Sequence, residues 1–119
     1  MSLRSAVGRV LASRTELDAA QERSVAVAAG CTPLDETVVR EQVRVAGVLR
    51  SVTVRPREGV QALAAELYDG TGSMTLVFLG RRHVPGIEAG RHLVAEGRVA
   101  EVDGAKTIFN PRYELQATG

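Results

Sequence analysis

The chain has 119 residues, 45% hydrophobic and 24% charged, a balance typical of one globular domain rather than of a disordered chain. Its formal net charge of +1 does not by itself indicate a polyanionic partner, so any case for nucleic acid depends on where the charges lie. A single cysteine, Cys31, and two histidines exclude an intrachain disulfide and a structural zinc site. We therefore expect one folded cytoplasmic protein without a metal or other cofactor.

The first 39 residues are expected to form a helical extension. Apolar residues recur there at helical spacing, as at Leu3, Val7 and Val10, and Gly30 can end the last helix. The basic start of the chain is interpreted as a bacterial helix rather than a targeting peptide, because the unbroken apolar core of a secretory signal is missing.

Beyond the extension, apolar residues recur at every second position, which indicates β-strands. The first strand changes phase between Gly47 and Arg50, so a bulge or bend is predicted there. The second and third strands are predicted over residues 61–68 and 73–79, joined by an Asp-Gly-Thr-Gly hairpin loop. Their outward positions form a mixed surface that can face solvent or a ligand. These positions are Ala64, Glu66, Tyr68, Ser73, Thr75 and Val77.

An irregular connection over residues 80–90 leads to the last part of the chain. A fourth strand is predicted across residues 93–99 and a fifth across 105–109, joined by an Asp-Gly turn. Five short strands without a long internal helix predict a small closed or partly open barrel over residues 40–115, followed by a short tail at 116–119. A two-sheet sandwich is the alternative.

Several motifs of the barrel region resemble one known family. They are Val43-Arg44-Val45-Ala46-Gly47, Glu66-Leu67-Tyr68-Asp69-Gly70-Thr71-Gly72, Leu76-Val77-Phe78-Leu79-Gly80, Gly97-Arg98-Val99 and Asn110-Pro111-Arg112-Tyr113-Glu114-Leu115. In these motifs the chain resembles OB-fold domains of the tRNA-anticodon type, especially the wedge domain of RecG-type branched-DNA helicases, and small stand-alone OB proteins of actinobacteria. The resemblance implies an all-β five-stranded OB-type Greek-key barrel, to which the N-terminal helical segment is added.

The resemblance also implies that nucleic acid binds across the outer face of strands two and three and on the flanking loops. By position, it assigns contacts to Tyr68, Thr75 and Val77 on the face, to Arg50, Arg55 and Arg57 near the first loop, and to Lys106 near the last loop. Arg55 and Arg57 flank Pro56, which is expected to lie in that first loop, where both side chains can reach phosphates. Separately, the adjacent Arg81 and Arg82 form a second basic pair able to clamp a phosphate.

No catalytic site emerges from the sequence. His83 and His92 have no nucleophile or carboxylate at motif spacing, and the Gly-Thr-Gly loop leads into a strand, so it has no helix N-terminus to hold a phosphate. We expect a non-enzymatic module that binds single-stranded or branched DNA, or RNA, mainly through the nucleic-acid backbone. The alternative is a protein–protein interaction or oligomerisation module, in which the N-terminal helices and the same face dock on another protein or another copy.

Overall fold

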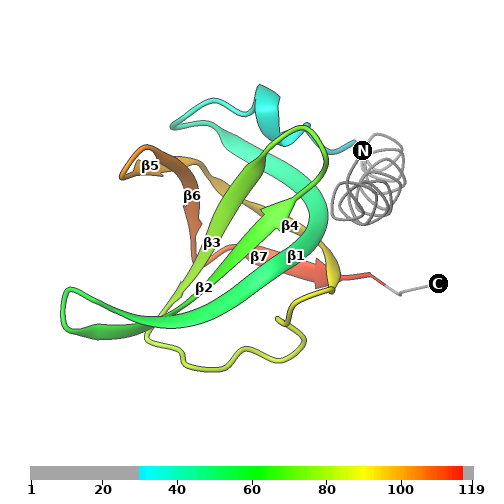
Figure 1. Ribbon diagram of the computed structural model, residues 1–119. Helices are drawn as coiled ribbons and strands as arrows, with labels where there is room; N and C mark the ends of the chain where they lie inside the picture. The colour runs from blue at the N-terminus through cyan, green and yellow to red at the C-terminus, as the bar shows by residue number, and fades with distance from the viewer. Residues whose placement is uncertain (1–29, 117–119) are drawn as a thin grey trace, which may run out of the picture.

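The computed structural model describes residues 30–116, which form an almost entirely β structure (Figure 1). Its strands are β1 (Gln42–Arg57), β2 (Val60–Tyr68), β3 (Ser73–Leu79), β4 (His92–Arg98), β5 (Ala100–Val102), β6 (Ala105–Phe109) and β7 (Arg112–Leu115). They form one sheet in the order β5-β6-β3-β2-β1-β4-β7, and the one helical element in this part of the chain is the 3-10 turn η1 (Leu34–Glu36). The predicted all-β class is confirmed, whereas the helices predicted before Gly30 lie outside the described residues.

Strand β1 bends so that it pairs with two neighbours. Its first half pairs with β4, and from Val48 onward it pairs with β2. The register against β2 shifts between Leu49 and Ser51, which leaves Arg50 as the extra residue of a bulge. The phase change predicted in this strand is thereby confirmed, because a bulge reverses which side chains face inward.

The sheet has seven strands, and the prediction of five was wrong. The predicted fourth strand ends at Arg98, because the backbone of Val99 bonds to the segment before β1. The Val99 N–H donates to the carbonyl of Glu41 at 2.9 Å, and the Val99 carbonyl accepts from the N–H of Arg40 at 2.7 Å. The chain resumes as β5, which pairs with β6, and β7 is added beside β4. Hydrophobic alternation does not reveal a one-residue interruption or a four-residue strand.

Strands β3 and β6 are parallel, whereas the other strand pairs are antiparallel. Asn110 fixes the end of this parallel pair: its N–H donates to the Val77 carbonyl at 2.6 Å, and its Oδ1 accepts from the Leu79 N–H at 2.9 Å. Strand β5 lies at one end of the sheet and β4 near the other, yet the two are consecutive in the chain. The sheet therefore curls back on itself (Figure 1).

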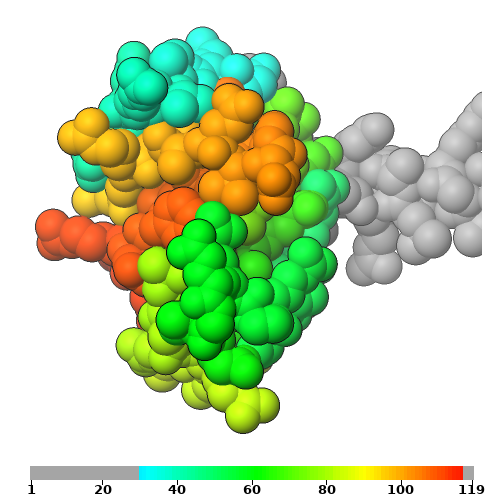
Figure 2. Space-filling view, turned by 90° about the vertical axis from the view of Figure 1, so that its left-hand side faces the viewer, coloured from blue at the N-terminus to red at the C-terminus, as the bar shows by residue number. Residues whose placement is uncertain are grey.

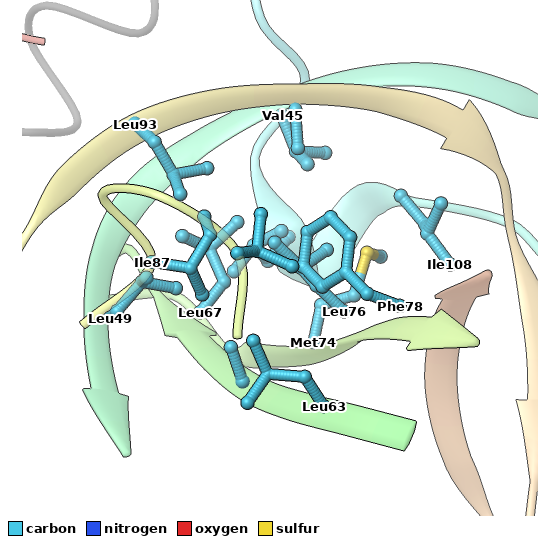
Figure 3. Close-up of a cluster of buried hydrophobic side chains, with 14 of the residues drawn as sticks. Val45, Leu49, Leu63, Leu67, Met74, Leu76, Phe78, Ile87, Leu93 and Ile108 are labelled. Carbon is cyan, nitrogen blue, oxygen red and sulfur yellow. The ribbon is translucent and has the colours of Figure 1, made fainter. Parts of the chain in front are cut away.

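The curled sheet encloses one hydrophobic core (Figure 3). Val45, Leu67, Leu76, Leu93 and Ile108 come from five different strands and are fully buried. Their side chains converge because inward positions alternate with outward ones along each strand. Burying a side chain of this size contributes about 1.5 to 3 kcal/mol, so this shared core is the main force that holds the curled sheet together.

A buried carboxylate ties η1 to the hairpin between β2 and β3. Asp69 is 2% exposed, and its Oδ2 accepts from the N–H of Leu34 at 2.9 Å. Its Oδ1 accepts from the Thr71 N–H at 2.9 Å, the Thr71 hydroxyl at 2.7 Å and the Gly72 N–H at 3.2 Å. Leu34 itself belongs to the core. The Asp-Gly-Thr-Gly loop thus anchors a segment that precedes β1.

The hairpin of β1 and β2 projects from the rest of the sheet (Figure 1). Both residues of its turn, at 58–59, have positive φ angles of 51° and 81°, so strand pairing continues to Arg57 opposite Val60. Arg55 and Arg57 therefore lie in a strand, and the expectation of a loop there was wrong. Pro56 suggested a break, but this half of β1 pairs with β2 alone, and proline is tolerated at a sheet edge.

Candidate nucleic-acid interface

Strands β1, β2, β3 and β6 share one outward surface, called here the outer face. In register, the outward residues of β2 lie beside those of β1 and β3, and those of β3 lie beside β6. Its members are Ser51, Thr53, Arg55 and Arg57 of β1, Val60, Ala62, Ala64, Glu66 and Tyr68 of β2, Ser73, Thr75, Val77 and Leu79 of β3, and Thr107 and Phe109 of β6. Figure 2 views the molecule from the side on which the hairpin and β6 lie.

One end of the outer face holds a cluster of an arginine, an aromatic ring and a carboxylate. The guanidinium carbon of Arg50 lies over the Tyr68 ring, 4.0 Å from its centroid, and a guanidinium nitrogen of Arg50 is ion-paired with Glu66. The Arg50 and Glu66 side chains are 43% and 40% exposed. This cluster is reachable from solvent, and the bulge at Arg50 is what directs the arginine toward Tyr68 and Glu66.

The other end holds a second arginine–aromatic pair. The guanidinium carbon of Arg57 lies 4.9 Å from the centroid of the Phe109 ring. Phe109 was absent from the predicted site, although its sequence carries a usable signal: Thr107 and Phe109 alternate with the inward Ile108. What the sequence did not reveal is that β6 pairs with β3 and so continues the face.

The middle of the outer face is smaller and more apolar. Thr75 lies between Glu66 and Thr107 in register and is half-buried. Val77, between Ala64 and Phe109, is 6% exposed. Thr75 can therefore offer a hydroxyl to a ligand, whereas Val77 forms part of the floor of the face.

The remaining predicted contacts are spread around this face. Arg55 is exposed on the hairpin, and Arg81 and Arg82 are exposed on the loop that follows β3. Lys106 is instead turned toward η1, where its Nζ donates to the Thr37 carbonyl at 2.5 Å and lies 3.5 Å from the Leu34 carbonyl. The structure thus gathers Arg50 with Tyr68, and Arg57 with Phe109, while Lys106 also fastens the segment before β1.

A separate ion pair lies on β1 and β4, away from the outer face. Arg44 donates to Glu96 at 2.5 Å, and this hydrogen bond raises the pKa of the Arg44 guanidinium above its ordinary value. In residues 30–116, no group of three or more His, Cys, Asp and Glu side chains is arranged to hold a metal ion. This same part of the chain contains no helix long and apolar enough to span a membrane.

Comparison with known proteins gives a likeness of fold. No protein-family model matches the chain, and no curated protein matches its sequence. Among solved structures, the fold is similar to part of the RecG chain in the structure of RecG bound to a three-way DNA junction, with a TM-score of 0.62 and 20% identity over 71% of this chain. The matched segment covers 12% of the RecG chain. The resemblance to RecG-type proteins is therefore supported at the level of fold.

Proposed function

We propose that the chain binds nucleic acid through the outer face, as a small OB-type module of the bacterial cytoplasm that carries out no catalysis. Its ligand is single-stranded or branched DNA, or RNA. The observation that carries the proposal is the placement of two arginine–aromatic pairs, Arg50 with Tyr68 and Arg57 with Phe109, at the two ends of one face. Aromatic rings offer stacking to bases of any sequence, and arginines offer bidentate contacts to phosphates.

The topology supports an OB-type Greek-key barrel as the framework of this site. Strand β1 pairs with both β2 and β4, and β3 pairs in parallel with β6. If β4 and β5 count as one strand interrupted at Val99, the ring β1-β2-β3-β6-β5/β4 has the five strands expected of the family. In that fold, the face of strands two and three is where oligonucleotides bind, and it is the face on which Tyr68 and Thr75 lie.

The likeness to RecG points in the same direction. The RecG structure is described as bound to a three-way DNA junction, and the segment similar to this chain is a part of that protein. A shared fold does not carry function by itself, so the proposal depends on the side chains of the outer face. With Arg50 at its end, the face supplies two rings, three arginines and several hydroxyls, a set suited to contacts with a sugar-phosphate strand.

The experiment is a fluorescence-anisotropy titration of labelled single-stranded, duplex and forked DNA and single-stranded RNA. We expect sequence-tolerant binding of single-stranded or forked forms in the micromolar range, which weakens roughly 20- to 50-fold between 50 and 200 mM salt if three to four phosphates are contacted. Arg57→Ala should weaken binding, whereas Arg112→Ala, which removes an exposed arginine of β7 from outside the face, should not. Equal effects of both variants would contradict the proposed face.

A protein-interaction function is the second candidate, because apolar side chains are exposed at the hairpin. Val54 and Val60 are 44% and 48% exposed, and Leu79 at the end of β3 is 39% exposed. The same titration separates the two functions. If no oligonucleotide binds at 50 mM salt while light scattering shows self-association that Val60→Ser abolishes, the protein-interaction function takes precedence.

A further inference from the structure

A depression of about 400 Å³ adjoins the Tyr68 end of the outer face. Its walls are η1, the loop between β2 and β3, the start of β3 and the turn between β5 and β6. Its polar side chains belong to Asp35, Glu66, Ser73, Thr75 and Lys106. The inference drawn here rests on the proposed function and concerns what part of a nucleic acid enters this depression.

The charges of the depression make it a poor phosphate site. Two carboxylates, Asp35 and Glu66, and one ammonium group, Lys106, line the depression, and Glu66 is also ion-paired with Arg50. That ammonium already donates to the Thr37 carbonyl at 2.5 Å and lies 3.5 Å from the Leu34 carbonyl. Carboxylates accept hydrogen bonds, so they favour a ligand that donates them, as the edges of the bases do.

The Arg50 guanidinium shows what chemistry the Tyr68 and Glu66 side chains beside the depression accept. It is a planar group with paired N–H donors, stacked over the Tyr68 ring at 4.0 Å and ion-paired with Glu66. Guanine carries the same pattern in its N1–C2–N2 edge, where two adjacent N–H groups point the same way in the plane of an aromatic ring. The side chains of Tyr68 and Glu66 start about 7 Å apart on one face of β2, which suits stacking on the first and hydrogen bonding to the second.

The other bases fit this arrangement less well. The Watson–Crick edge of thymine or uracil places one N–H between two carbonyls, and the edges of adenine and cytosine pair one amino group with acceptors, so each would set an acceptor against the carboxylate. Guanine sets two donors against it. Its O6 acceptor also suits the third N–H of the Lys106 ammonium group.

We propose that Tyr68 and Glu66, together with the adjoining depression, form a guanine subsite. Tyr68 stacks on the base, Glu66 accepts hydrogen bonds from N1–H and N2–H, and Lys106 donates to O6. In the free protein the Arg50 guanidinium lies over the Tyr68 ring, and it gives way to the base. The remainder of the outer face stays sequence-tolerant, so one nucleotide of the bound strand carries the preference.

The test is an anisotropy titration of labelled thymidine oligonucleotides that differ at one central position. We expect deoxyguanosine there to bind about tenfold tighter than thymidine, within the range for one bidentate base contact. Deoxyinosine, which lacks the N2 amino group, should lie between the two, and this arm needs no protein variant. Deoxyadenosine and deoxycytidine should bind like thymidine.

Two protein variants assign the preference to its residue. Glu66→Gln should abolish the guanine preference, because an amide offers one acceptor in place of two. Glu88→Gln removes the same charge from an exposed position in the loop between β3 and β4 and should keep the preference. Glu66 is exposed enough for its replacement to leave the fold intact, which thermal unfolding checks.

Each outcome bears on the proposal differently. Equal binding of all the oligonucleotides overturns the guanine subsite and leaves the proposed function standing, whereas binding of none overturns both. A Glu66→Gln variant that binds every oligonucleotide more tightly, with the guanine preference unchanged, also overturns the subsite. Glu66 would then serve only to neutralise Arg50.

Discussion

Two pairs of the same chemistry lie at opposite ends of the outer face, and one carboxylate distinguishes them. Arg50 covers Tyr68 and is ion-paired with Glu66, whereas Arg57 covers Phe109 with no acid in the pair. The charge of Arg50 is therefore largely balanced in the free protein, and that of Arg57 is available. Under the proposed function, the two arginine–aromatic pairs serve different ends, base selection at Tyr68 and phosphate attraction at Phe109.

The backbone next to the two rings is also held by different numbers of hydrogen bonds. Each aromatic is followed by a residue whose side chain fixes the local backbone: Asp69 after Tyr68, and Asn110 after Phe109. Asp69 is buried and accepts four hydrogen bonds. Asn110 is exposed, and its Oδ1 accepts one, from Leu79. The Tyr68 end is therefore built on the more rigid support.

The largest expected effect comes from removing these two supports. Asp69→Ala should lower the free energy of unfolding by about 3 kcal/mol or more, because it strands the buried N–H of Leu34 and removes hydrogen bonds to a charged acceptor. Asn110→Ala should cost about 1 kcal/mol, a single hydrogen bond at an exposed site. Urea unfolding of both variants measures the difference, and equal losses would contradict a more rigid Tyr68 end.

A second change acts on the packing beneath Tyr68. A Cβ on Gly47 would lie 2.5 Å from the carbonyl oxygen of Tyr68 and 2.9 Å from its carbonyl carbon. Gly47→Ala should therefore cost about 2 to 3 kcal/mol, as overpacking against backbone does. Gly72→Ala is the matched control, since its Cβ would meet atoms of Asp35 no closer than 3.5 Å. A loss under about 0.5 kcal/mol for Gly47→Ala would be ordinary surface behaviour and would argue against this close approach.

The sequence predicted much of the framework. Period-two alternation located β2 and β3 closely, since most of their inward residues are apolar, the Asp-Gly turn located β6, and the phase change in β1 marked its bulge at Arg50. It failed at Val99 and at β7, where backbone pairing with distant segments decides the strand ends. Backbone pairing between segments far apart in the chain leaves no local pattern in the sequence.

The candidate face was predicted in part for the same reason. Tyr68 and Thr75 were assigned to a face because both strands of their hairpin are adjacent in sequence. Phe109 was not predicted, because its place beside Val77 depends on the parallel pairing of β3 with β6. The ion pair of Glu66 with Arg50 was not predicted either, because the bulge turns the Arg50 side chain toward a side that simple alternation does not give it.

Removing each ring tests whether both ends bind bases. Tyr68→Ala and Phe109→Ala should each weaken single-strand binding by about 1 to 3 kcal/mol, the usual cost of one lost stacking contact. Neither change should alter the slope of log affinity against log salt, because no phosphate contact is lost. An unchanged affinity for Phe109→Ala in anisotropy titrations would confine the binding face to the Tyr68 end.

The smallest expected effect is a change in the salt dependence of binding, and it tests directly whether Arg50 and Arg57 differ. Each phosphate contact to a single strand contributes about 0.7 to the salt slope, so Arg57→Ala should flatten the slope by about that amount. Between 50 and 200 mM salt this corresponds to a change of roughly 2.6-fold in affinity. Arg50→Ala should flatten it less, because the Arg50 charge is already balanced by Glu66 and so makes less than a full phosphate contact.

A double variant strengthens this measurement. Arg55→Ala with Arg57→Ala should flatten the slope by about 1.4 and weaken all sequences alike, because phosphates carry no base identity. Glu66→Gln should have the opposite effect. It removes the carboxylate that balances Arg50, so the slope of log affinity against log salt should become steeper, as if Arg50 made a full phosphate contact. If Arg50→Ala and Arg57→Ala flatten the slope equally, the carboxylate does not distinguish the two ends, and the Arg50 guanidinium already contacts phosphate while it is paired with Glu66.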